Sequence, residues 1–301
     1  MIPIEKIPLA ILYVLTQWTV FKALYVFPPL MLAVRIWQTR DQQGVSLIDR
    51  IMPAPGTTRS IASNMVLSLI NTFGWASVMV LFNAVLQDFW AETVGVTPPE
   101  PMADWWLPAQ VLAIVVLFDF VNYWSHRLLH RPWMWGIHQL HHSDEHMNFS
   151  TSNRIHVLEA VQMNFVSIMM IGWFIVPAEA LGIALVIRGW YGMYVHSRLP
   201  WDHGPLKRVL ASPNYHDWHH CDDPAVYGKN LCDMFPIWDI AFGTYYNPGR
   251  CDKPLGVSDA PDDIIAGQIY PFLYWARLWK AYRARKSALA VEPLQAEPAA
   301  Q

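Results

Sequence analysis

Charged residues are scarce in this chain. They make up 15% of its 301 residues, against roughly 25% in soluble globular domains. The net charge is −3, so no nucleic-acid partner is suggested. Hydrophobic residues reach 53%, tryptophan occurs 16 times and the mean hydropathy is +0.19. This composition predicts an integral membrane protein.

Cysteine is also scarce, and several common motifs are missing. The three cysteines, Cys221, Cys232 and Cys251, form no C-x-x-C pair and are odd in number. Free thiols in a reducing compartment are therefore expected rather than a disulfide framework. H-E-x-x-H is absent, so a zincin protease is not supported. No flavin, haem or ferredoxin signature is visible, so a redox role would need electrons from a separate protein.

The apolar residues gather in segments long enough to cross a bilayer, which takes about 20 mainly apolar residues. The first segment is interrupted by Lys22 and Pro28–Pro29 and lacks the cleavage site of a signal peptide. The last is long enough for a helical hairpin that enters and leaves on one side. The predicted fold is all-α, with about four transmembrane helices and a histidine-rich helical cap, drawn from residues 7–37, 61–86, 105–124 and 158–195.

Basic residues are missing between Arg59 and Arg127 and again between Arg154 and Arg188. Because cytoplasmic loops carry the excess of Lys and Arg, the loops inside these two stretches are predicted to face away from the cytoplasm. The histidine-rich segments lie with the basic residues. The predicted location is therefore the inner membrane of a bacterium or the endoplasmic reticulum of a eukaryote, with the histidines on the cytoplasmic face.

After Pro200 the chain becomes polar, and it ends in a predicted helix near 264–286. The late part of this helix, WARLWKAYRARK, mixes aromatic and basic residues, which suits an anionic membrane surface. An ordinary solvated helix explains it equally well. We expect an N-terminal transmembrane region at 1–104, a catalytic domain at 105–246, and an interfacial helix with a disordered tail at 247–301.

Eight of the 12 histidines form three clusters with helical spacing. Residues i, i+3 and i+4 share one face of a helix, so each cluster presents its imidazoles in one direction. Neutral imidazole is the commonest metal ligand and suits iron, zinc and copper. One closed zinc site takes four ligands, so eight histidines predict two metals. A bis-histidine haem would leave most of them unexplained. The clusters are His126 and His130; His138, His141 and His142; and His216, His219 and His220.

This H-x3-H, H-x2-H-H, H-x2-H-H pattern resembles the fatty acid hydroxylase/sterol desaturase superfamily. The resemblance covers roughly residues 105–246 and includes the ending that runs from Tyr227-Gly228 through Trp238-Asp239 to Phe242-Gly243-Thr244. It implies a membrane-bound non-haem di-iron oxygenase, which uses dioxygen and two electrons to hydroxylate or desaturate an unactivated C–H bond of a lipid. Sterol, carotenoid, ornithine-lipid, alkylglycerol and fatty-acyl substrates remain open.

The resemblance implies that all eight clustered histidines are metal ligands, with His196 as a ninth. Val195 stands where the family often has Asn, and the segment from Arg154 to Glu159 lacks the proline of the family's R-x-H-P-x-E motif. His156 is left open as a ligand or a nearby supporting residue, and His146 and His203 are expected to be ordinary polar residues. The implied cofactors are two iron ions with O2 as co-substrate, and zinc is a possible mismetallated state.

Other residues are candidates for supporting roles. Asp119 and Asn122, deep in the third apolar segment, are expected to support the site. An external donor of the ferredoxin, rubredoxin or cytochrome b5 type is implied, and Arg131, Lys207 and Arg208 are candidates to dock it. The alternatives are a membrane zinc-dependent lipid hydrolase and a metal-binding membrane protein. The acids that are candidates to orient imidazoles, each alternatively a solvated loop acid, are Asp144, Asp217, Asp222, Asp223 and Asp239. The aromatic residues that are candidates to line a lipid path, and alternatively ordinary interfacial anchors, are Phe118, Tyr123, Trp124, Trp190, Tyr191 and Tyr194.

Overall fold

The computed structural model describes residues 27–38, 57–71, 82, 85–86, 88–96, 99–257, 261 and 263–291. Over these residues the chain is mostly helical and forms no strand; one isolated bridge joins Cys221 and Leu255. The predicted all-α class is therefore confirmed for the described part. Of the first apolar segment, only α2 (Phe27–Gln38) lies among the described residues.

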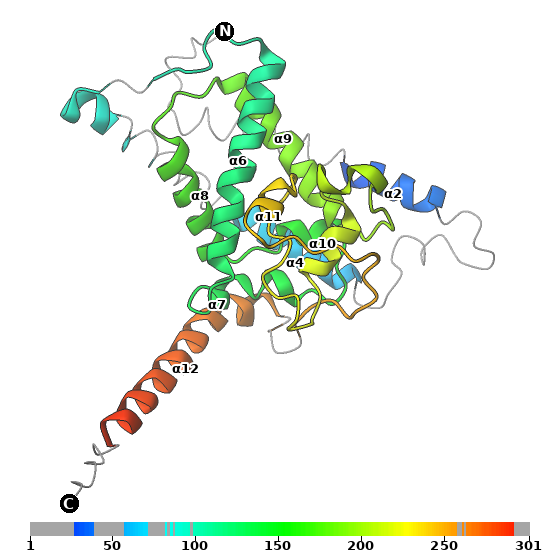
Figure 1. Ribbon diagram of the computed structural model, residues 1–301, viewed down its shortest axis with the longest axis vertical. Helices are drawn as coiled ribbons and strands as arrows, with labels where there is room; N and C mark the ends of the chain where they lie inside the picture. Colours follow the sequence, from blue (N-terminus) through cyan, green and yellow to red (C-terminus); the bar gives the residue numbers. More distant parts are fainter. Residues whose placement is uncertain are drawn as a thin grey trace, which may run out of the picture.

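The central element is α6 (Leu107–Leu129), which runs along the axis of the molecule in Figure 1. Pro108 occupies the first turn, where the missing N–H has no intrahelical partner to lose. Within the described ranges, α6 is the one helix that is long and apolar enough to cross a membrane. The count of four spans and their orientation stay predictions.

Two further apolar helices pack on α6. α8 (Val157–Ile171) and α9 (Ala178–Val195) lie along it, joined by a connection that ends at Pro177 (Figure 1). The pair matches the helical hairpin that the sequence predicts at 158–195. Its physical effect is to bring the end of α9 back to the end of α6 at which the histidines lie.

Of the segment predicted as a second span, 61–86, the longest described stretch is the helix α4 (Thr57–Ile70) with residue 71. One face of α4 is buried: Ser60, Asn64 and Leu67 follow one another at intervals of four and three residues. The two polar side chains need polar partners. They find them at Asp144, whose Oδ2 accepts from Ser60 Oγ at 2.8 Å and from Asn64 Nδ2 at 3.3 Å. This face of α4 therefore belongs to the histidine-bearing cap.

The cap consists of short helical segments at the C-terminal end of α6. The last helix, α12, begins beside α7 and points away from the rest of the described chain (Figure 1), in agreement with the helix predicted at 264–286. Its interfacial role stays a prediction. Besides α2, α4, α6, α8 and α9, the described helical segments, inside and outside the cap, are η3 (Phe89–Val94), α7 (Trp135–His138), η4 (His141–Ser143), η5 (Phe149–Asn153), η6 (Gly204–Arg208), α10 (Pro213–His219), α11 (Ile237–Ala241) and α12 (Ile264–Val291).

Candidate metal centre

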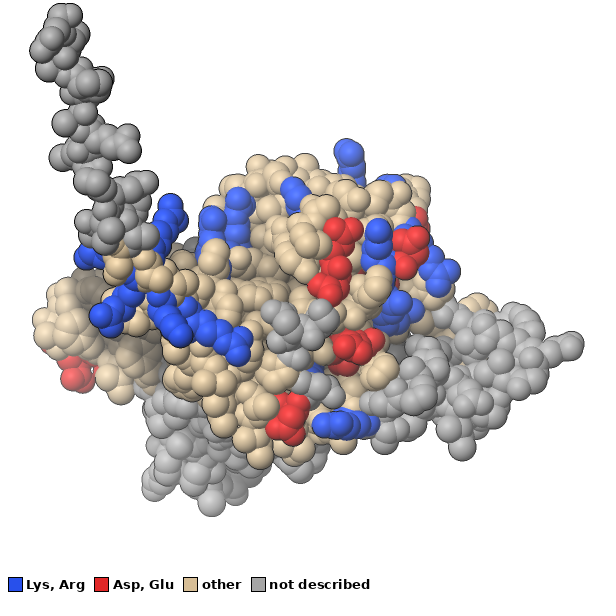
Figure 2. Space-filling model, turned by 90° about the horizontal axis from the view of Figure 1, so that it is seen from below, with Lys and Arg blue, Asp and Glu red and all other residues tan. Residues whose placement is uncertain are grey.

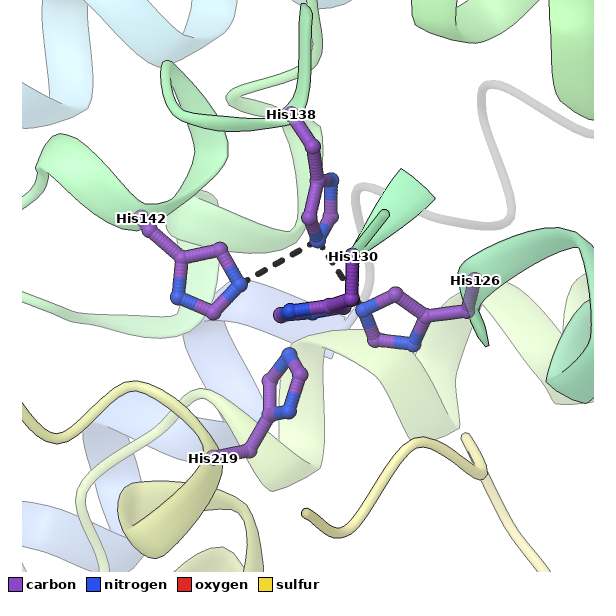
Figure 3. Close-up of side chains that lie close together, drawn as sticks. All are labelled: His126, His130, His138, His142 and His219. Carbon is purple, nitrogen blue, oxygen red and sulfur yellow. Dashed lines mark hydrogen bonds between the residues drawn. The ribbon is translucent and has the colours of Figure 1, made fainter. Parts of the chain in front are cut away.

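The structure gathers nine histidines into two clusters. Within each cluster one ring nitrogen per residue lies within 4.8 Å of all the others, which makes both clusters able to bind a metal ion. Figure 3 shows the imidazoles of the larger cluster converging on one point. We call the larger one the five-histidine cluster (His126, His130, His138, His142 and His219) and the other the four-histidine cluster (His141, His196, His216 and His220). These are the nine residues predicted from the sequence.

Local helix geometry sets the direction of these side chains. α10 begins at Ser212, whose Oγ accepts from Tyr215 N at 3.1 Å, and Pro213 follows in the first turn. This cap fixes where the helix starts, so that His216, His219 and His220 follow at the spacing of one face. α6 presents His126 from its last turn in the same way.

Backbone carbonyls orient three of the rings. Nδ1–H of His126 donates to Leu231 O at 2.8 Å, that of His219 to Lys229 O at 2.8 Å, and that of His196 to Gly192 O at 2.6 Å. A carbonyl oxygen only accepts, so the proton of each neutral ring stays on Nδ1. Each Nε2 is thereby left with a lone pair.

The fourth orienting contact is a carboxylate. Nδ1–H of His138 donates to Glu159 Oε1 at 2.8 Å, and both side chains are buried. A carboxylate on the outer nitrogen of a histidine fixes the tautomer and makes the inner nitrogen a better ligand. This role of Glu159 was not predicted from the sequence. The signal for it was an acid in the first turn of a mainly apolar helix.

Short contacts between ring nitrogens show that the donor set fits a metal. His126 and His138 both use Nδ1–H as the donor, yet their Nε2 atoms lie 3.0 Å apart. Two lone pairs at this distance repel one another unless a cation lies between them. Nitrogens at right angles around an ion about 2.1 Å away would be about 3.0 Å apart, whereas tetrahedral angles would give about 3.4 Å. The Nε2 atoms of His196 and His216 show the same 3.0 Å separation.

The imidazoles are held neutral, as metal binding requires. Burial lowers the pKa of His196 to about 4. For the other clustered rings outside α6, burial is again the main cause, and nearby imidazoles lower the pKa further. Those pKa values lie well below the ordinary 6.5 for His130, His138, His141, His142, His216, His219 and His220.

Buried polar contacts hold the segment that carries His141 and His142. The fully buried Arg154 donates through Nε to Leu140 O at 3.0 Å and to Ser143 Oγ at 2.9 Å. These two residues flank the histidine pair. Arg154 Nη1 also donates to Asn64 Oδ1 at 3.3 Å, which links the segment to α4. The backbone of the histidine pair is thus fixed from one side.

A strap from residue 254 to 257 fixes the other side and joins the two clusters. Gly256 N donates to His220 O at 3.2 Å, and Val257 N donates to His142 O at 2.8 Å. Gly256 has φ +84°, and a Cβ there would lie 2.8 Å from Glu145 N. Only glycine allows both this backbone conformation and this close approach. The strap lies beyond the predicted catalytic range of 105–246, and its role was not predicted from the sequence.

Three histidines lie outside both clusters. The ring of His156 caps α8 by accepting from Leu158 N at 2.9 Å, and its Nε2–H donates to Gln268 O at 3.0 Å. Both nitrogens are therefore occupied away from the centre, and the open question about His156 is answered against direct ligation. His203 Nε2 bonds Tyr194 OH at 2.6 Å. The side chain of His146 joins neither cluster.

The five aspartates predicted to orient imidazoles pair elsewhere, which corrects that expectation. Asp144 accepts from Ser60, Asn64 and Thr151; Asp217 pairs with Arg198; Asp222 accepts from Tyr227; Asp223 pairs with Lys253; and Asp239 accepts from Tyr215, Thr244 and two backbone N–H groups.

The role expected for Asp119, support of the site, stays a prediction. This buried carboxylate accepts from Met234 N, Phe235 N and Trp238 Nε1 at 2.8–3.0 Å, and so holds the turn before α11. It contacts no clustered imidazole among these bonds. The aromatic lipid path remains a prediction, although Tyr191 OH already donates to Ala211 O at 2.5 Å.

We expect Glu159→Gln to lower the metal affinity of the five-histidine cluster by roughly 10- to 100-fold, the usual cost of losing a residue that orients a ligand. The amide still accepts from His138 but carries no charge. Chelator competition on metal-loaded protein measures the effect. The matched control is Glu179→Gln, which changes an exposed acid in the first turn of α9. Equal affinity in the two variants would contradict the role of Glu159.

Comparison with known proteins gives a match over the histidine-bearing region. Residues 111–244 match the model of the fatty acid hydroxylase family. Alkylglycerol monooxygenase of Danio rerio is 30% identical over 181 residues, which are 59% of this chain and 38% of that protein. Ornithine lipid hydroxylase OlsE of Rhizobium tropici is 26% identical over 234 residues, which are 74% of this chain and 64% of that protein.

A further relative is the very-long-chain aldehyde decarbonylase GL1-11 of Oryza sativa subsp. indica, 29% identical over 157 residues, or 50% of this chain and 58% of that protein. The matches span 28–38% of the length of the alkylglycerol monooxygenases. No solved structure gives a significant match.

Proposed function

The chain belongs to the fatty acid hydroxylase family through residues 111–244, and from this premise we propose that it is a membrane-bound di-iron oxygenase of lipids. It hydroxylates, or alternatively desaturates, an unactivated C–H bond of a sterol, carotenoid, acyl or ornithine lipid. The lipid monooxygenase and hydroxylase relatives support an oxidoreductase that acts on a lipid. The observation that carries the proposal is the pair of buried all-histidine clusters.

We infer that the nine clustered histidines hold the two metal ions. When bound, iron supplies the redox chemistry by which dioxygen and two electrons convert a C–H bond into an alcohol and water. The chain's own residues orient the ligands and keep the site dry. The carbonyls of Gly192, Lys229 and Leu231 and the carboxylate of Glu159 hold protons on the outer nitrogens. Eight of the nine clustered histidines are buried and His130 is half-buried, which keeps bulk water from competing for the inner nitrogens.

Iron is favoured over zinc by the donor count of the larger cluster. Structural zinc is almost always tetrahedral with four ligands, whereas the larger cluster offers five. Zinc in purified protein would therefore be a mismetallated state.

The membrane assignment rests on the family and on α6. We propose that the metal centre faces the cytoplasm and receives its electrons from a separate ferredoxin, rubredoxin or cytochrome b5 type of protein. The sequence contains no redox motif of its own that would supply them.

Isotopic labelling with ¹⁸O2 tests the proposed oxygenase activity. Iron-loaded protein in lipid nanodiscs is supplied with ¹⁸O2, a reductant and a cellular lipid extract, and the lipids are analysed by mass spectrometry. One ¹⁸O atom in a hydroxylated lipid is expected for the hydroxylase, and loss of two hydrogens without label for the desaturase. A lipid product that forms equally well without oxygen would point to the zinc hydrolase and overturn the proposal.

A further inference from the structure

The helix α12 has two halves with different surroundings. The first half packs on the segment between His130 and His141, while the second half projects away from the described chain (Figure 1). Pro271, the one proline inside the helix, lies within the packed half. The projecting half carries the charges.

Close contacts anchor the packed half. Tyr274 OH donates to Pro132 O at 2.7 Å, and Trp275 Nε1 donates to Trp133 O at 2.8 Å. A Cβ at Gly136 would lie 2.7 Å from Tyr274 Cδ1, so α12 lies against the backbone of α7. The position of α12 is therefore tied to the chain segment that enters the five-histidine cluster.

An indole ring next to the α12 contact at Gly136 lies against that cluster. The ring of Trp135, next to Gly136 in the chain, has its centroid 5.2 Å from that of His142, 5.4 Å from that of His130 and 6.0 Å from that of His138. Trp135 is partly exposed, whereas His138 and His142 are buried. The ring thus connects the surface beside α12 to three imidazoles of one cluster.

The projecting half is strongly basic. No Asp or Glu occurs between residues 264 and 291, and the basic side chains are all exposed. Figure 2 shows a group of blue side chains on one side of this face of the molecule, with no acidic side chain among them. We call this surface the α12 basic surface; it consists of Arg277, Lys280, Arg283, Arg285 and Lys286.

Resting on the proposed function, we propose that the α12 basic surface docks a small acidic one-electron donor protein, and that the electron passes through Trp135 to the five-histidine cluster. Each encounter oxidises the donor by one electron and reduces the metal centre by one. Two encounters supply the two electrons that one O2 requires, and two protons from solvent complete the water that is formed. Positive charge opposite an acidic partner raises the association rate and fixes its orientation.

The arrangement favours a protein over a lipid surface. In Figure 1, α12 starts at the histidine-bearing end of α6, the candidate span, and runs away from it. The charges also interrupt the apolar side of the helix, because Lys286 follows Tyr282 by four residues and so lies on the same face. A helix that lies in a bilayer surface keeps that face apolar.

The test compares two double charge reversals. Arg277→Glu/Lys280→Glu changes the α12 basic surface. Lys207→Glu/Arg208→Glu changes, by the same net charge, the exposed basic pair on η6, which is the competing docking candidate named from the sequence. Binding of a ferredoxin, a rubredoxin and a cytochrome b5 is measured on the metal-free protein in phosphatidylcholine nanodiscs at low salt. Reduction of the iron-loaded centre is then followed with each reduced donor and with dithionite, which needs no docking.

The α12 variant is expected to bind the donor at least 10-fold more weakly and to be reduced by it at least 10-fold more slowly. Its iron content and its reduction by dithionite should match wild type, and the η6 variant should stay within about twofold. An equal loss in the η6 variant, or failure of all three donors at a centre that dithionite reduces, overturns the docking site. A centre that never holds iron contradicts the proposed function instead.

The lipid alternative has its own readout. An environment-sensitive dye on Ser287→Cys, an exposed position, is expected to show the same emission in phosphatidylglycerol and phosphatidylcholine nanodiscs. The three native cysteines are buried and do not compete for the label. A blue shift in phosphatidylglycerol, with donor binding unchanged by Arg277→Glu/Lys280→Glu, would assign α12 to an anionic membrane surface and overturn the proposal.

Discussion

His216→Ala is expected to remove one of two bound iron ions and all measurable lipid oxidation. The four-histidine cluster has no spare ligand, and the Nε2 of His216 contacts those of His196 at 3.0 Å and His220 at 3.2 Å. Three imidazoles would remain. Loss of a direct ligand should cost more than the roughly 10- to 100-fold that follows loss of a residue that only orients one. The number of iron ions per chain, measured by mass spectrometry, should fall from about two to about one.

The same change in the other cluster is expected to give a different metal count. His138→Ala leaves four imidazoles in the five-histidine cluster. Iron binding should therefore be weaker there but not lost. Activity should disappear in both variants, because both ions take part in the reaction. The matched control is His146→Ala, a histidine four residues from His142 that joins neither cluster. Two irons retained in His216→Ala would contradict the two-cluster assignment.

Eight of the nine clustered histidines were predicted because their spacing is local. Residues at i, i+3 and i+4 share a helix face whatever surrounds the helix, so His216, His219 and His220 indicate a site before any fold is known. His196 was found differently, through the family resemblance, since nothing nearby in the sequence marks it. The structure places it 3.3 Å from His141 through their Nε2 atoms, although 55 residues separate them.

The residues that support the centre were harder to predict because their partners are remote. The acidic partner of His138 was sought among aspartates beside the clusters, yet it is Glu159 on the apolar helix α8. Hydropathy also assigned 61–86 to the bilayer, while Asn64 on α4 bonds Asp144, 80 residues away. Buried polar groups need partners, but composition does not say which. Ser60 and Asn64, one turn apart, were the available sign that α4 has a polar face.

Asp239→Ala is expected to destabilise the protein by at least about 4 kcal/mol. Its buried carboxylate accepts from Tyr215 OH, Thr244 Oγ1, Leu231 N and Cys232 N at 2.6–2.9 Å. Each buried donor left without a partner costs roughly 1–3 kcal/mol, and domains have only about 5–15 kcal/mol in total. Thermal unfolding in detergent measures the loss. Asp252→Asn, at an exposed position, is the control and should change stability by no more than about 0.5 kcal/mol.

Asp239 affects the metal centre indirectly, through residues that position its ligands. A milder variant separates this effect from unfolding. Leu231, held by Asp239 through its N–H, presents the carbonyl that accepts from His126, and Tyr215 precedes His216 on α10. Asp239→Asn keeps one acceptor oxygen but turns an amide NH2 toward N–H and O–H donors, so a smaller loss of about 2 kcal/mol is expected. Iron binds the native state alone and stabilises it by mass action. Added iron should therefore raise the unfolding free energy of the variant and of wild type by the same amount. The difference in stability between the two proteins should stay constant. Wild-type stability without iron, combined with weaker iron binding, would instead mean that Asp239 serves the metal centre and not the fold.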